Sequence, residues 1–172
     1  NEVVLIEKDI TLSGGWNASF NNQTGTSIID GQETRRGITI TVANVVVDNF
    51  TIQNGFANPG GGILNDGTLT LNNSLVNGNV SLWLGGGIYN RGTLTINNSM
   101  ISGNSAGESC CSGGGGGGGI YNDSGTIILN KSQVNDNTIL GGFKGSGIGN
   151  YGTFTLNNST VSGNIGGQAA IF

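Results

Sequence analysis

Apolar and polar residues alternate in short runs along this chain, and Gly or Asn closes each run. Residues 68–71 read Thr-Leu-Thr-Leu and residues 93–96 read Thr-Leu-Thr-Ile. Alternation over a few residues indicates a strand with one buried face. No stretch carries a 3.6-residue apolar period long enough for a helix. The pattern therefore predicts an all-β chain.

The runs belong to a repeat. A glycine-rich motif leads into Ile63, Ile88 and Ile120, and the equivalent residue of a fourth copy is Ile148, at separations of 25, 32 and 28 residues. An earlier, degenerate copy at residues 45–52 aligns without gaps on the sequence 24 residues later. Self-similarity at a near-fixed period indicates a stacked array of similar units.

Each repeat holds three short runs, which is one coil of a parallel β-helix (a β-solenoid) with three strands per coil. About six coils at a strand spacing of about 4.8 Å would make a stack about 30 Å long. We predict a single domain, with residues 1–42 as an irregular coil or capping region and residues 43–172 as the repeat β-helix. The predicted inward columns are Ile63/Ile88/Ile120/Ile148, Leu69/Leu94/Ile127/Phe154, Leu71/Ile96/Leu129/Leu156 and Val76/Ile101/Val134/Val161.

Asn recurs at the corners of the coils. Stacked Asn side chains can hydrogen-bond along such a column, as in cross-β ladders. We expect one column at Asn65/Asn90/Asn122/Asn150 and another at Asn73/Asn98/Asn158.

Composition excludes several functions. The chain has no His, which removes Ser-His-Asp and Cys-His chemistry and most zinc sites. Its net charge is −4, and it lacks the basic patch that marks a nucleic-acid-binding protein. No apolar run approaches the roughly 18 residues of a membrane span. We expect neither a nucleic-acid partner nor a membrane-spanning segment.

The acidic residues do not form a catalytic pair. Glycoside hydrolysis needs two carboxylates facing one bond, and no two acids recur on adjacent outward strand positions. Asp66, Arg91 and Asp123 fall at equivalent corners and predict a surface ion ladder. The two Asn-Asp corners offer too few oxygens for calcium, which takes six to eight. We predict no catalytic residue, no metal, no cofactor and no enzyme activity.

Two further features each have both a structural and a functional interpretation. Stacked Thr-x-Thr pairs at residues 68–70, 93–95 and 153–155 suit outward strand positions, and a flat Thr array is also how some β-solenoids bind ice. Tyr89 and Tyr121 form either a packing ladder or a surface contact for sugar.

Cys110 and Cys111 are adjacent in the insertion at residues 105–119. They are reduced thiols, a strained disulfide between neighbours, or a bridge to another chain in an oxidising exterior.

The glycine-rich motifs at residues 85–88 and 117–120 resemble the Gly-Gly-Ala-Ile repeats of polymorphic outer-membrane proteins, which are bacterial autotransporter passengers. Residues 49–54 approximate the second repeat of that family, Phe-x-x-Asn. The resemblance covers about residues 43–172. It implies a right-handed parallel β-helix and a secreted, extracellular or cell-surface location in a bacterium. It says little about activity, because such proteins include adhesins and surface filaments.

The ends of the array carry the functional prediction. The ends of a solenoid are unpaired edges that require capping, and a head-to-tail contact that does not close gives a filament. We expect a non-enzymatic structural protein whose partner is itself; the alternative is an adhesin fragment that binds glycan or a cell surface. The expected assembly residues are Val3, Val4, Leu5, Ile6, Ala169, Ala170, Ile171 and Phe172.

Overall fold

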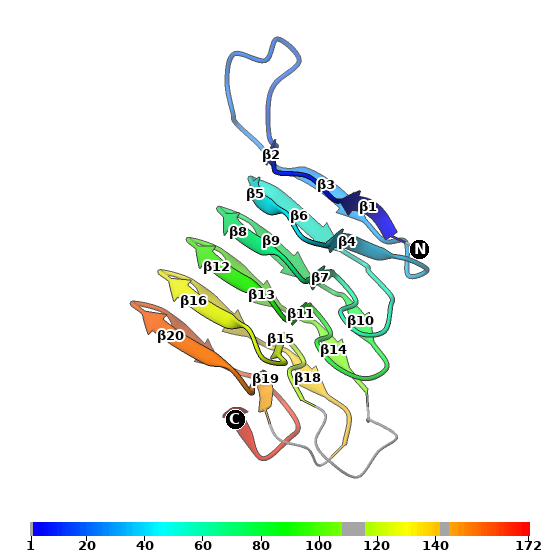
Figure 1. Cartoon of the computed structure of the whole chain (residues 1–172), viewed down its shortest axis with the longest axis vertical. Helices are drawn as coiled ribbons and strands as arrows, with labels where there is room; N and C mark the ends of the chain where they lie inside the picture. The colour runs from blue at the N-terminus through cyan, green and yellow to red at the C-terminus, as the bar shows by residue number, and fades with distance from the viewer. Residues whose placement is uncertain (1, 108–115, 142–144) are drawn as a thin grey trace.

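The protein is described by a computed structural model that covers residues 2–107, 116–141 and 145–172. It is a parallel β-helix, and the strands of successive coils lie in layers along its long axis (Figure 1). The described residues include no helix. The predicted fold class is confirmed.

Three long sheets form the sides of the helix, and each takes one strand from each coil. The first sheet has seven strands: β1 (Glu2–Ile6), β4 (Arg36–Ile40), β7 (Ile63–Asn65), β11 (Ile88–Asn90), β15 (Ile120–Asn122), β19 (Gly145–Asn150) and β22 (Ala169–Ile171). The second has six: β2 (Ile10–Ser13), β5 (Asn44–Asp48), β8 (Thr68–Asn72), β12 (Thr93–Asn97), β16 (Thr126–Asn130) and β20 (Thr153–Asn157). The third also has six: β3 (Ser27–Asp30), β6 (Phe50–Gln53), β9 (Leu75–Asn77), β13 (Met100–Ser102), β17 (Gln133–Asn135) and β21 (Thr160–Ser162).

A fourth, small sheet is present that the sequence pattern does not predict. It joins β10 (Val80–Ser81), β14 (Ser105–Ala106) and β18 (Thr138–Ile139). These two-residue strands are too short to show any alternation, which is why the apolar pattern does not reveal them.

The predicted inward columns are confirmed by the strand register. Ile63 pairs with Ile88, Ile88 with Ile120, and Ile120 with Ile148. The other three columns pair in the same way through the second and third sheets. Most of these side chains are completely buried. A buried Leu, Ile or Val contributes roughly 1.5–3 kcal/mol, so the columns form the main hydrophobic core.

The coils begin earlier than the repeat motif. Residues 1–42, expected as an irregular cap, contain β1 to β4, and these strands pair with their counterparts in the next coil. The glycine motif is absent there, so these strands form without it. Residues 14–26, between β2 and β3, form a loop that projects beyond the first coil (Figure 1).

The first predicted Asn column is a hydrogen-bonded ladder. The amide of Asn65 donates to Asn90, that of Asn90 to Asn122, and that of Asn122 to Asn150, each at 2.7 Å. The first three side chains are fully buried.

The second predicted column has a different role. Asn73, Asn98 and Asn158 adopt left-handed backbone with φ of 47–48°, a conformation that Asn tolerates better than most residues. The amide ladder lies one residue earlier, at Asn72/Asn97/Asn130/Asn157, with hydrogen bonds of 2.8–2.9 Å.

A third ladder, not predicted, is buried where the third sheet turns toward the small one. Its amides donate along the stack at 2.9 Å. The same side-chain oxygens accept the backbone N–H of the preceding coil at 3.0 Å. Its members are Asn79, Asn104, Asn137 and Asn164.

Candidate functional site

The residues predicted as an assembly interface lie at the two outer strands of the first sheet, β1 and β22. In β1, Val4 and Ile6 pack against the core. Val3 and Leu5 face outward and are 37% and 51% exposed. Each strand has one edge that pairs with no other described strand.

At the opposite end, Ile171 of β22 pairs with Ile148 and continues the same inward column. Phe172 follows it and remains 44% exposed. The backbone N–H of Phe172 donates to the carbonyl of Ile148 at 3.0 Å, and its carbonyl accepts from Asn150 at 2.8 Å. β22 is therefore held in the sheet along one edge, and its other edge pairs with no described strand.

An apolar hollow of about 340 Å³ lies over the first coil. The inward side chains of the first coil line it, and no described residue forms another strand layer above them. Its lining residues are Val4, Leu5, Ile6, Glu7, Lys8, Ile10 and Leu12.

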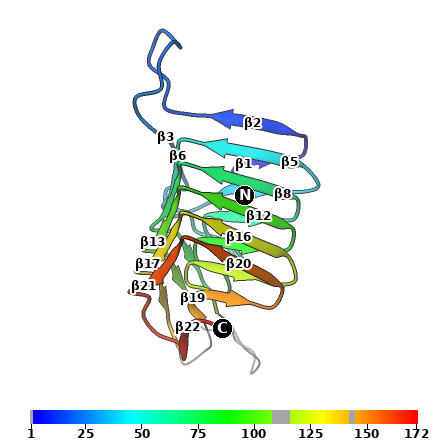
Figure 2. The ribbon, with the colours of Figure 1, turned by 90° about the vertical axis from the view of Figure 1, so that its left-hand side faces the viewer.

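The two ends differ in shape. The first sheet has seven strands and the second and third have six, so β22 stands one layer beyond β20 and β21. At the other end the loop of residues 14–26 projects past the first coil, from the corner between the second and third sheets (Figures 1 and 2). Phe20 in this loop is 78% exposed and Trp16 is 42% exposed. The two ends therefore differ, with a step at one and a projecting loop at the other.

Tyr89 and Tyr121 form a packing ladder, the first of the two arrangements expected for them. Their rings stack with centroids 5.6 Å apart and planes 12° apart, and each residue is only 7% exposed. Tyr151 and Phe172 extend the column, at centroid distances of 5.6 and 6.1 Å. Gly149 occupies the next position of the Tyr121 column, and the Tyr121 ring contacts the ring of Tyr151. The exposed members of this column are therefore Tyr151 and Phe172.

Burial raises the pKa of Tyr89 to about 12, with a smaller contribution from Asp123. Burial likewise raises the pKa of Tyr121 to about 12, with the neighbouring Tyr151 next. Because an unfolded Tyr titrates near pH 10, the folded state favours the neutral phenols. This contribution to stability is complete below about pH 10 and is lost as the pH rises through about 12.

We expect the Tyr151→Phe variant, which retains only these two phenols, to show phenolate absorbance at a higher pH in buffer than in urea. Ultraviolet absorbance followed during alkaline titration measures both midpoints. Identical midpoints for the folded and unfolded chain would contradict the burial of the two rings.

The predicted corner ladder forms in part. The guanidinium of Arg91 donates to both carboxylate oxygens of Asp66, at 2.7 and 2.9 Å, and lies 5.7 Å from the centre of the Tyr89 ring. No ion pair from Arg91 to Asp123 is described. Such exposed pairs contribute only about 0–1 kcal/mol, so this corner is a minor element of the surface.

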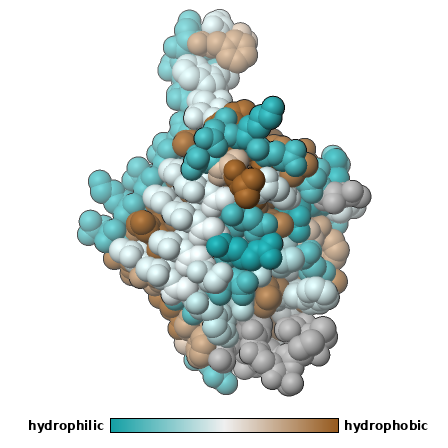
Figure 3. Space-filling view, viewed as in Figure 1, coloured by the Kyte–Doolittle hydropathy of each residue, from teal (hydrophilic) through white to brown (hydrophobic). Residues whose placement is uncertain are grey.

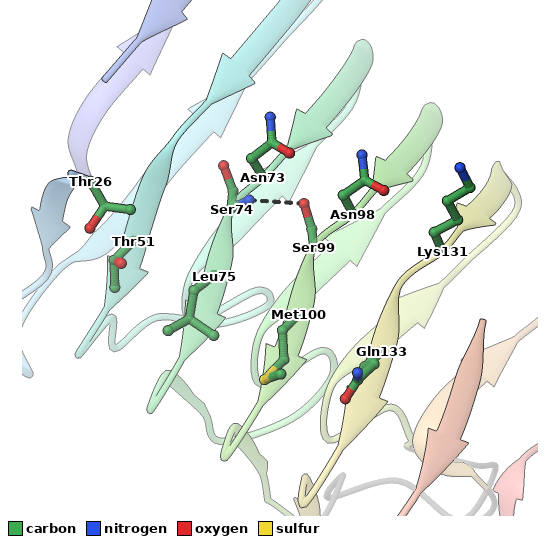
Figure 4. A pocket seen from close by; sticks show the side chains of 10 residues that line it. All are labelled: Thr26, Thr51, Asn73, Ser74, Leu75, Asn98, Ser99, Met100, Lys131 and Gln133. Carbon is green, nitrogen blue, oxygen red and sulfur yellow. Dashed lines mark hydrogen bonds between the residues drawn. The ribbon is translucent and has the colours of Figure 1, made fainter. Parts of the chain in front are cut away.

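A shallow groove of about 540 Å³ runs along the corner between the second and third sheets (Figure 4). Hydroxyl and amide groups alternate in it with Leu75 and Met100, and Lys131 supplies its one cation. On the face shown in Figure 3, hydrophobic side chains form separate spots among polar and near-neutral ones. The groove suits a hydroxyl-rich ligand, and glycan binding stays a prediction. Its lining residues are Thr26, Thr51, Asn73, Ser74, Leu75, Asn98, Ser99, Met100, Lys131 and Gln133.

Cys110 and Cys111 lie outside the described residues. Within residues 2–107, 116–141 and 145–172, no three acidic, Cys or His side chains gather as a metal site would require. The same residues contain no helix with the length and hydropathy needed to cross a bilayer.

Comparison of the chain with protein-family models, with curated protein sequences and with solved structures finds no match.

Proposed function

We propose that this chain is a non-enzymatic extracellular structural protein whose coils stack end to end with those of a second copy. The observation that carries the proposal is the position of β1 and β22 at opposite edges of one parallel sheet. The free edge of β1 in one copy can pair with the free edge of β22 in another and continue the sheet. All strand pairs of the three long sheets are parallel, so the contact is head to tail and does not close.

The chemistry of the two edges supports this pairing. In continued register, Val4 would follow Ile171 in the inward column and Leu5 would follow Phe172 in the outward one. Both contacts are apolar, and the hollow over the first coil provides apolar surface for them. Main-chain hydrogen bonds between added strands supply affinity, and matched side chains supply specificity.

The step and the projecting loop support the same direction of stacking. With β1 placed on β22, one layer of the second and third sheets is missing at the junction. The loop of residues 14–26 projects from the corner between these two sheets, where the missing layer would be. We assign the loop to that recess, with Phe20 and Trp16 as its apolar contacts.

The resemblance to polymorphic outer-membrane proteins supports an extracellular or cell-surface location in a bacterium. A rigid β-helix with few charges is suited to a filament or a surface layer at such a site.

The Leu5→Lys variant tests the proposal. A lysine on an edge strand opposes pairing with another strand, so we expect the native chain to associate with rising concentration and this variant to remain monomeric. Light scattering after size-exclusion chromatography measures both masses.

Leu82→Lys is the matched control, because Leu82 is 50% exposed against 51% for Leu5 and follows β10, away from both β1 and β22. It should associate as the native chain does. Equal association of all three proteins would contradict the proposed interface.

A further inference from the structure

The second sheet presents a regular array of threonines on its outer face. The strands β8, β12, β16 and β20 stack as successive layers (Figure 2). Their positions that alternate with the core face outward, and the register places these positions in columns. One column is Thr68/Thr93/Thr126/Thr153 and the next is Thr70/Thr95/Ile128/Thr155. The single departure from Thr is Ile128, which keeps a β-branched side chain of similar shape.

The register fixes a two-dimensional lattice. Neighbouring strands are about 4.8 Å apart, and outward residues two apart along a strand are separated by about 6.6 Å. Every Thr therefore places one hydroxyl and one methyl at nearly constant intervals in both directions.

The lattice is held rigidly from beneath and from one side. Leu69, Leu94 and Ile127, which alternate with the outward residues, are completely buried. Along one margin runs the amide ladder of Asn72, Asn97, Asn130 and Asn157.

The array is uncharged and free to bind water. None of the twelve outward positions of β8, β12, β16 and β20 is acidic or basic. No hydrogen bond to another described group involves the seven Thr hydroxyls; the described Thr hydroxyls that do bond are those of Thr34, Thr39 and Thr41.

We propose that this threonine face binds the surface of ice. Ice presents water oxygens at regular intervals in two directions, close to the spacing of the Thr columns, and the hydroxyls can hold waters in that arrangement. The methyl groups also favour contact with ice, because the contact removes their apolar surface from bulk water. No charged side chain in the array has to lose its hydration shell. The inference is independent of end-to-end stacking, since it uses a side of the β-helix and not its ends.

The test is thermal hysteresis and inhibition of ice recrystallisation by the whole 172-residue chain. We expect the native chain to be active and the Thr95→Lys variant, which puts a charge in the centre of the array, to lose that activity. Thr51→Lys is the matched control: Thr51 also faces outward at intermediate exposure, but from β6 of the third sheet. It should retain full activity, and circular dichroism verifies that both variants are folded.

Four outcomes would overturn the inference. They are absence of activity in the native chain, equal loss in the two lysine variants, a folded Thr95→Lys variant with native activity, and adsorption to crystalline cellulose or chitin without any effect on ice. Light scattering on the same samples reports stacking separately, so failure of one proposal is distinguishable from failure of the other.

Discussion

The Asn104→Ala variant should lose about 4 kcal/mol of unfolding free energy, because two buried backbone groups lose their partners at roughly 2 kcal/mol each. The Asn104 side chain is 1% exposed. Its oxygen accepts from the backbone N–H of Asn79 at 3.0 Å, and its amide donates to the carbonyl of Val76 at 3.0 Å. It also links Asn79 to Asn137 along the ladder. Alanine can replace none of these bonds. Urea denaturation followed by circular dichroism measures the change.

Asn157→Ala is the control for this prediction. Asn157 ends the neighbouring amide ladder, donates to Asn130 at 2.8 Å and is exposed. Water can satisfy its partner, so we expect a loss of about 0.5 kcal/mol. If the two variants lost equal stability, burial of the ladder at Asn104 would not be the source of the effect.

The Gly86→Ala variant should cost about 3 kcal/mol, the upper part of the usual range for overpacking. A Cβ on Gly86 would meet the carbonyl oxygens of Ser105, in β14, and of Gly118, the equivalent glycine of the next coil. Both are backbone atoms held by stacked strands, so neither can move aside cheaply. Thermal and urea unfolding report the loss.

Gly25→Ala provides the comparison, since an added Cβ there meets nothing within 4 Å. This substitution in the projecting loop should change stability by less than about 0.5 kcal/mol. A native-like stability for Gly86→Ala would show that the coils can separate locally at little cost.

The core of the β-helix could be predicted from sequence because strand alternation and repeat spacing are both local signals. Ile88 is equivalent to Ile63 in the repeat, and the structure pairs these two residues. The Asn65 ladder was predictable for the same reason, as each member directly follows a short strand run.

The buried ladder at Asn104 was not predicted, because residues in a turn have no alternation that shows which side chains point inward. A signal was nevertheless present: Asn follows Gly at residues 78–79, 103–104 and 163–164. The same limit applies to Asn73, whose recurrence predicted its column but not its left-handed backbone.

The shapes of the two ends also could not be predicted from the sequence. Their step depends on how many strands each sheet contains, and the three strands of the first coil lack the glycine motif. The direction of the loop between Gly14 and Thr26 depends on its own contacts, such as the hydrogen bond from Trp16 Nε1 to Ser13 Oγ at 3.0 Å.

End-to-end stacking is the central claim, and electron microscopy of the 172-residue chain at high concentration tests it most directly. We predict filaments whose axial repeat is about 34 Å, because each copy contributes the seven strand layers of its first sheet at about 4.8 Å per layer. Particles that stay single at every concentration, with the β-helix intact by circular dichroism, would contradict it.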